Sequence, residues 1–465
     1  MSKSVLKKAC ALSLTMGLVL SFTAGCGSTT GQADGTDAQG QSSNNTAGTT
    51  EAKGSGEKIV IRFMTREAGS DAVVPIHKEE FARFEAEHPN VVIQNESIAE
   101  ENAYNNKIKT SIATGTQPEL FNYPAVIGAV GWAKNGVIMN IDSLIEDKEW
   151  SGGFIDGAFE NWNFEKYGVS GHYAIPYSFS PEVILYNTEI FQKAGITKTP
   201  ETMSELFDVI EKLKAAGVVP MSMGNKDVWR GGHLHNNILY RYIGVDKAKD
   251  LGLRTKKWTD ADVVGSLQAI KDLVTAGAFE EGFGGLDYNT EKTLFLNGEY
   301  AMSCNGSWII ADYMSSDSPN KDKISFFPFP YFDDKPELKG DSVLYSSPIF
   351  LSNATEGEKR NMQMEFAKFL YGKECSQERM DKIGRFSSRK DVTAPENSSK
   401  LLKDVIAYMG TITNPGGDYF EYEADPAMLD VCRNAIAGMM LGDSAEKAAQ
   451  TIQGSLDAYD NSLKK

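Results

Sequence analysis

Short apolar runs alternate with amphipathic helical segments from Lys58 onward, and this alternation limits the possible folds more than any other feature of the sequence. The predicted strands are rich in β-branched and aromatic residues and cover 59–64, 91–93 and 119–121. The predicted helices between them cover 71–88 and 107–113 and end at Pro89 and Gly115. This order is typical of an open parallel α/β sheet, which binds ligands beyond the carboxyl ends of its strands.

The same alternation returns later in the chain. Further strands are predicted at 182–186 and 300–303, and further helices at 202–216, 262–276, 362–370 and 445–463. The helix at 202–216 carries an apolar stripe that includes Met203, Leu206 and Ile210, and Gly217 ends it. We therefore predict two α/β halves.

The first 57 residues have the composition of targeting and tether segments. Lysines precede an apolar stretch at 9–22, which is shorter than the roughly 20 residues that a membrane-spanning helix needs. Thr23-Ala24-Gly25-Cys26 then resembles the lipobox of bacterial lipoproteins, so residues 1–25 are predicted to be a signal peptide and Cys26 the lipidated residue. Residues 26–57 are small and polar and are predicted to be a flexible linker with a reach of about 30 Å.

The charge balance excludes some classes of partner. The 465 residues include 47 Lys and Arg against 63 Asp and Glu, a net charge of −16. A surface this acidic argues against nucleic acid, whose phosphates need clustered basic residues. It also argues against electrostatic docking on anionic lipid, which leaves the lipid anchor as the expected contact with a membrane.

Motifs for catalysis and for metal binding are missing from the sequence. The chain has no G-x-x-x-x-G-K-[ST], H-E-x-x-H or G-x-S-x-G pattern. The pair His233-x-His235 could share one face of a strand, but no acidic cluster or cysteine accompanies it, so no metal and no cofactor are expected. An extracellular glycosidase stays open as an alternative, because 63 acidic residues offer many carboxylate pairs.

Four stretches give the chain a family resemblance over residues 58–465. They are Phe81-x-x-Phe84-Glu85-x-x-x-Pro89-x-Val91-x-Ile93; Thr114-Gly115-Thr116-Gln117-Pro118-Glu119-Leu120-Phe121; Tyr173-Ala174-Ile175-Pro176 followed by Tyr186-Asn187; and Phe295-x-x-Gly298-x-x-Ala301-Met302 followed by Gly306-Ser307-Trp308. In this order, behind a lipobox and a tether, they resemble family 1 of the extracellular solute-binding proteins of ABC importers, the carbohydrate-binding group.

The resemblance implies an α/β, periplasmic-binding-protein-like fold of type II, with two lobes and a hinge that the chain crosses three times. The crossings are expected near Tyr177, Tyr331 and Arg385. Lobe one is then 58–177 plus 331–384, and lobe two is 178–330 plus 385–465. Ligand is expected between the lobes, where closure of the hinge traps it.

A sugar site needs aromatic platforms for the C–H faces of the ring and polar groups for its hydroxyls. Trp308 follows a predicted strand at its carboxyl end, and the matching tryptophan of the family lines the cleft. Trp229 and Asp227 lie in what we interpret as a polar loop at 224–232. The remaining expected ligand contacts follow other strands, lie at the crossings, or belong to an aromatic cluster, and they are Glu67, Asn122, Tyr123, Tyr177, Arg385 and Tyr419.

The expected function is that of a monomeric, lipid-anchored receptor on the outer face of a bacterial cell membrane. By the resemblance, it captures a carbohydrate, more specifically an oligosaccharide, and delivers it to an ABC permease whose cytoplasmic ATPase supplies the energy. No catalysis is expected in this chain. A solute receptor that signals to a sensor kinase, in place of a permease, is the second alternative.

Overall fold

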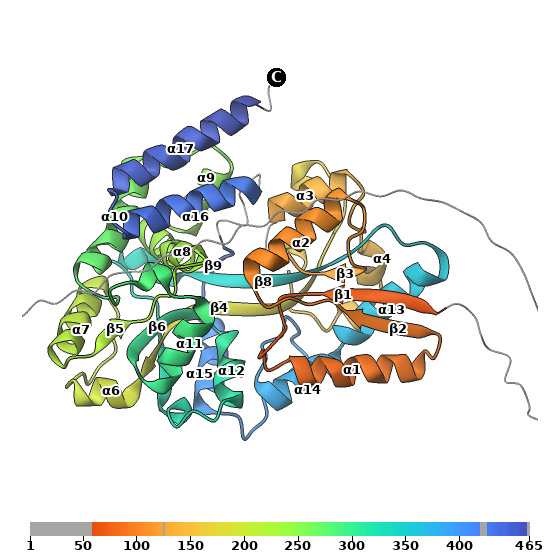
Figure 1. Cartoon of the computed structure of the whole chain (residues 1–465), viewed down its shortest axis with the longest axis horizontal. Helices are drawn as coiled ribbons and strands as arrows, with labels where there is room; N and C mark the ends of the chain where they lie inside the picture. The colour runs from red at the N-terminus through yellow and green to blue at the C-terminus, as the bar shows by residue number, and fades with distance from the viewer. Residues whose placement is uncertain (1–57, 124–125, 419–425, 463–465) are drawn as a thin grey trace, which may run out of the picture. The chain divides into compact units, whose positions relative to one another are not determined.

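The computed structural model describes residues 58–123, 126–418 and 426–462, which belong to one compact unit, Gly56–Lys465 (Figure 1). Its described strands form one mixed sheet in the order β2-β1-β3-β8-β4-β6-β5, with β7 paired to β4 and β9 paired to β8. The strands are β1 (Ile59–Met64), β2 (Val91–Asn95), β3 (Leu120–Phe121), β4 (Ile175–Asn187), β5 (Val219–Met221), β6 (Tyr300–Gly306), β7 (Ile324–Pro328), β8 (Asp341–Leu351) and β9 (Asn414–Gly416).

Two long antiparallel strands connect the halves of the sheet. β4 pairs with β8 from Ile175 to Pro181 and then with β6 from Glu182 to Tyr186. β8 in turn pairs with β3 at Leu351. β1 runs parallel to β2 and β3 in one half, and β5 runs parallel to β6 in the other. Each half therefore has an edge where the carboxyl ends of parallel strands meet.

Helices cover both halves (Figure 1). The described α-helices are α1 (Val74–Glu87), α2 (Glu101–Ala113), α3 (Val126–Lys134), α4 (Asp142–Glu146), α5 (Lys148–Ser151), α6 (Thr188–Lys193), α7 (Met203–Ala215), α8 (Trp229–Ile243), α9 (Val245–Gly252), α10 (Ala261–Thr275), α11 (Tyr288–Asn297), α12 (Ile309–Ser315), α13 (Gly357–Leu370), α14 (Lys373–Ile383), α15 (Lys400–Met409), α16 (Pro426–Met440) and α17 (Ala445–Ser462).

The predicted alternation of strands and helices is confirmed, but several elements begin earlier than predicted or were not predicted. α2 begins at Glu101, six residues before the predicted helix at 107–113. The segment 224–232 is not all loop, because α8 begins at Trp229. α7 follows the prediction closely: Thr202 and Glu205 form a capping box at its start, and Met203, Leu206 and Ile210 are buried.

Candidate functional site

Polar side chains gather at the carboxyl ends of β1 and β3. Arg66 follows β1, and its Nη1 lies 3.0 Å from Oε2 of Glu101 at the start of α2. Asn122 follows β3, and its carbonyl accepts a hydrogen bond of 2.5 Å from the buried hydroxyl of Tyr104 on α2. The first turns of α2 thus hold this edge of the sheet in place and add charge to it.

The other half presents an aromatic cluster that consists of Trp229, His233, Tyr288, Trp308 and Tyr345. The Trp229 ring lies 4.9 Å from His233 and 4.8 Å from Tyr288, both edge-on. The Trp308 ring lies 5.9 Å from His233 and 5.9 Å from Tyr345. Trp308 is half-buried, whereas Trp229 is buried, so of the two indoles Trp308 is the more accessible to a ligand.

Hydrogen bonds and a glycine determine where the Trp308 ring lies. Its Nε1 donates to the Tyr288 hydroxyl at 3.1 Å, and that hydroxyl donates to Oδ1 of Asn305 at 3.3 Å. The ring passes directly over Gly306, where a Cβ would lie 1.9 Å from an indole carbon. Only a residue without a side chain leaves room for the indole in this position.

We therefore expect Gly306→Ala to displace the Trp308 ring, because no Cβ is tolerated at 1.9 Å from an aromatic carbon. The measurement is the fluorescence spectrum and near-UV circular dichroism of the variant, compared with those of Gly454→Ala, where a Cβ meets nothing within 4 Å. Identical spectra for Gly306→Ala and the unsubstituted protein would contradict the expected displacement.

A series of charged and polar side chains in close contact extends from the carboxyl end of β1 to the aromatic cluster. Glu101 pairs with Arg66 and lies 4.0 Å from Nη1 of Arg433 on α16. Nη2 of Arg433 lies 3.4 Å from Asp418, and Asp418 lies 3.4 Å from Nε2 of His233. Residues from α2, α8 and α16 thus meet at one place.

Asp227 also faces this place. Burial raises the pKa of its carboxyl group, and the negative charges of Glu101 and Glu100 raise it further. The carboxylate lies just before α8 and contributes to an acidic surrounding. Such a surrounding suits a neutral ligand with hydroxyl donors better than an anion.

Several buried polar atoms at the two sheet edges have no hydrogen-bond partner within the part of the chain that the structure describes. They include Nε1 of Trp229, Nδ2 of Asn305, Oγ of Ser307 and Oδ1 of Asn122. Buried polar groups in proteins are nearly always hydrogen-bonded. A ligand rich in hydroxyl groups can donate to the oxygens and accept from the nitrogens.

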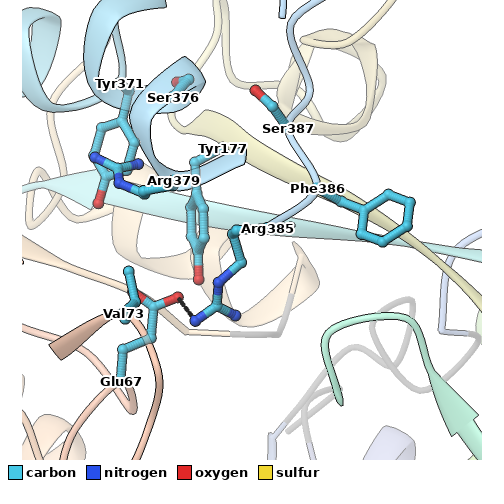
Figure 2. Close-up of a pocket in the computed structure, with 9 residues that line it drawn as sticks. All are labelled: Glu67, Val73, Tyr177, Tyr371, Ser376, Arg379, Arg385, Phe386 and Ser387. Carbon is cyan, nitrogen blue, oxygen red and sulfur yellow. Dashed lines mark ion pairs between the residues drawn. The ribbon is translucent and has the colours of Figure 1, made fainter. Parts of the chain in front are cut away.

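Glu67, Tyr177 and Arg385 converge in a second place, beside α14 (Figure 2). Oε1 of Glu67 lies 3.3 Å from Nη2 of Arg385, which also pairs with Asp71 at 2.9 Å. The cavity that they line holds about 10 Å³, room for about one water molecule. A sugar ring does not fit in this cavity as it stands.

The charges around Glu67 stabilise its ionised form. Burial alone would raise the pKa of this carboxyl group, but the Arg385 guanidinium and the hydrogen bond with His77 lower it to about 2. His77 bonds to Glu80 on its other nitrogen, and although burial opposes the charge, the two carboxylates raise the pKa of the imidazole. The group is a compact buried network.

This network predicts a specific pH dependence of stability. The pKa of Glu67 is about 2 in the folded protein against an ordinary 4.5, so its contribution is present above pH 4.5 and is lost as pH falls toward 2. The loss between pH 5 and pH 3 is on the order of 2 kcal/mol. Urea unfolding at both pH values should show a smaller difference for Glu67→Gln than for the unsubstituted protein. An equal difference in the two proteins would refute the assignment.

The structure places the other predicted site residues differently. Tyr123 is 4% exposed and packs edge-on against Trp132 at 5.1 Å, so its ring lies in the hydrophobic core. Trp229 and Trp308 both belong to the aromatic cluster. Tyr419 and Cys26 lie outside the described residues. The polar residues Glu101, His233, Asp418 and Arg433 join the site without having been predicted as ligand contacts.

His233 and His235 do not form a metal site. His235 is fully buried, stacks on Trp258 at 5.6 Å and bonds through Nε2 to Ser266, away from the aromatic cluster. The described residues contain no group of three or more His, Cys, Asp or Glu placed to hold a metal ion. Within the same residues, no helix has the length and apolarity to span a membrane.

Comparison with solved structures defines the fold class. A chitin oligosaccharide binding protein superposes with a TM-score of 0.79 at 22% identity, over 87% of this chain and 99% of that one. Maltose-bound MalE3 of T. maritima superposes with a TM-score of 0.69 at 17% identity, over 86% of this chain and 100% of that one. The fold is therefore the type II periplasmic-binding-protein-like fold, as predicted.

The sequence itself defines the family. The chain belongs to the bacterial extracellular solute-binding proteins, whose family model matches residues 80–406. It is 24% identical to the multiple sugar-binding protein of Streptococcus mutans over 281 residues, which are 59% of this chain and 63% of that protein. It is 31% identical to an sn-glycerol-3-phosphate-binding periplasmic protein of Brucella abortus over 31% of this chain and 33% of that protein. The aligned regions thus span less than two thirds of these relatives.

Proposed function

We propose that the chain captures a carbohydrate, more specifically an oligosaccharide, and delivers it to the transmembrane permease of an ABC importer. The observation that carries this proposal is Trp308, a half-buried indole at the carboxyl end of β6, beside polar atoms without partners in the described residues. An indole face stacks on the apolar face of a sugar ring, and the polar atoms around it suit the hydroxyls. The relatives named for sugar binding support the same class of ligand.

The proposed mechanism is closure of two lobes around the sugar. We place lobe one at 58–177 plus 331–384 and lobe two at 178–330 plus 385–465, with crossings near Tyr177, Tyr331 and Arg385. A sugar that contacts both lobes binds the closed state better and shifts the population toward it. The pairing of β4 and β8 with strands of both halves supports a connection of this kind.

The proposed ligand contacts fall into two groups. Trp308 is the proposed platform and Trp229 a second aromatic contact, with Asp227 and Asn122 as polar contacts. Glu67, Tyr177 and Arg385, which line the small cavity beside α14, form the second group. Tyr419 completes the proposed set, whereas Tyr123, whose ring packs in the hydrophobic core, is left out of it.

We further propose a lipid anchor at Cys26, behind a signal peptide at 1–25 and a linker at 26–57, on the outer face of the bacterial cell membrane. Cys26→Ser is expected to release the protein into the medium or the soluble extract, because the polar body has no other predicted attachment. Continued sedimentation of Cys26→Ser with membranes, after a high-salt wash, would contradict the anchor.

The experiment that tests the proposed function is a thermal-shift screen of the purified protein. The panel contains chitotriose, xylotriose, maltotriose, raffinose and galactose, with amino acids and metal salts as controls. A sugar at 100 times its dissociation constant adds about 2.7 kcal/mol to the stability of the folded state and raises the melting temperature. No shift with any sugar would overturn the proposal.

Two further measurements separate the alternatives. The first is recovery of the glycan after binding. The proposed receptor is a monomer that has no cofactor and no catalytic activity, so it leaves the glycan intact, whereas an extracellular glycosidase cleaves it. Uptake that is lost when the permease gene is deleted supports delivery to an importer, and uptake that is unchanged supports a sensor-linked receptor.

A further inference from the structure

A buried carboxylate holds one nitrogen of the His233 ring. Glu182 on β4 is 2% exposed, and one of its oxygens bonds to Nδ1 of His233 while the other accepts from Nδ2 of Asn237. A carboxylate of this kind can only accept, so Nδ1 carries the hydrogen and donates it. Glu182 thereby determines the orientation of the imidazole. Nε2 is the ring nitrogen that does not contact Glu182.

Nε2 of His233 faces Asp418. The distance from Nε2 to Oδ2 of Asp418 is 3.4 Å, longer than the roughly 2.7–3.2 Å of a good N–H···O hydrogen bond. The same Oδ2 atom of Asp418 also lies 3.4 Å from Nη2 of Arg433. His233 and Asp418 thus lie side by side, with His233 positioned by Glu182 and Asp418 paired with Arg433.

The pair lies beside the proposed sugar platform. The His233 ring stands edge-on to Trp308 at 85° and edge-on to Trp229 at 75°. The ring is 8% exposed, so a contact there would be shielded from water. A sugar ring stacked on Trp308 has its hydroxyls at its rim, close to His233, which lies 5.9 Å from the indole and whose Nε2 lies 3.4 Å from Asp418.

We infer that His233 and Asp418 together bind two neighbouring hydroxyls of a pyranose ring that stacks on Trp308, and that Glu182 positions His233 for this contact. The inference rests on the proposed function and names the part of the sugar that the site recognises. A hydroxyl donates and accepts, so the contact forms whether Nε2 carries a hydrogen or not. The inference also gives a role to His233, which does not form a metal site with His235.

Two substitutions of His233 separate a ligand contact from a structural role. His233→Asn places an amide near the position of Nδ1, so it keeps a partner for Glu182 and loses the group at Nε2. His233→Gln places an amide near the position of Nε2 and leaves Glu182 without its histidine. A ligand contact predicts that His233→Asn weakens sugar binding about 10- to 100-fold and that His233→Gln binds more tightly than His233→Asn, even though it melts at a lower temperature. A purely structural role predicts the reverse order of affinities.

The affinities are measured by calorimetry on the full chain, with the panel sugar that binds the unsubstituted protein most tightly. His235→Asn is the matched control, because it lies on the same helix and contacts Ser266; it should lower the melting temperature and leave the affinity unchanged. Equal affinity of His233→Asn and the unsubstituted protein overturns this inference alone. Failure of every panel sugar to bind the unsubstituted protein overturns the proposed function, and this inference with it.

Discussion

Arg230→Met is expected to lower the free energy of unfolding by about 3–5 kcal/mol, because it leaves a buried carboxylate without its cation. Arg230 and Glu291 are each 1% exposed, and two hydrogen bonds of 2.8 and 2.9 Å join the guanidinium to the carboxylate. The arginine also donates to the Cys304 carbonyl at 2.6 Å. After the substitution, Glu291 keeps the hydrogen bonds from the Ser222 hydroxyl and the Gly224 backbone and has lost both bonds from the guanidinium.

The same change should reach the aromatic cluster. The guanidinium carbon lies 5.2 Å from the Trp229 ring and 5.6 Å from the Tyr288 ring, so both rings pack against the guanidinium. The measurement is urea unfolding at neutral pH, with Lys400→Met as the control. Lys400 pairs with Asp404 on the surface, where such a pair contributes about 1 kcal/mol or less. Equal losses for the two variants would contradict a special role for the buried pair.

The sequence predicted the fold well because local chemistry determines most of its elements. Runs with β-branched residues became β1 and β2, the short run Tyr300-Ala301-Met302-Ser303 became the first part of β6, and a capping box began α7. The sequence did not predict strand β8. This strand contains Pro348, which cannot donate a hydrogen bond to a sheet and which lies opposite Pro176 of β4, at an irregularity in the pairing of the two strands. The pairing joins two distant segments of the chain and leaves no local signal in the sequence.

The start of α8 shows a second limit of local reasoning. No side chain caps this helix, Val228 before it has a positive φ of 55°, and two glycines occupy its first turn. The polar residues and glycines of 224–232 are typical of a loop, and the sequence therefore predicted one there. On a strand, His233 and His235 would share a face, whereas on a helix residues two apart point in different directions. The helix therefore sends one histidine to Glu182 and the other to Ser266.

The candidate site was predicted in part. Trp308 could be predicted because a tryptophan after a strand and a small turn stands at the carboxyl end of a sheet. Glu67 and Arg385 are 318 positions apart in the sequence (385 − 67). Their ion pair depends on how the two halves of the fold come together. The same holds for Glu101 and Arg433. Only three-dimensional structure brings such groups within reach.

Trp308→Ala is expected to weaken sugar binding by about 1–3 kcal/mol, or about 5- to 150-fold, because it removes the surface on which a ring stacks. The loss should come without global unfolding, since the indole is only half-buried and its Nε1 donates to the hydroxyl of a side chain, Tyr288, and not to the backbone. The measurement is calorimetry with the tightest panel sugar. Trp308→Phe, which keeps an aromatic face, should recover part of the affinity.

The control for this prediction is a tryptophan of the other half. Trp150 is 8% exposed, packs against Phe154 and donates to the Lys368 carbonyl at 3.0 Å. Trp150→Ala should lower the melting temperature and leave the sugar affinity unchanged. If Trp308→Ala behaves in the same way, Trp308 is a packing residue, and the platform on which the proposed function depends must lie elsewhere. If the two variants separate into one that loses affinity and one that loses stability, the carboxyl end of β6 is where the sugar binds.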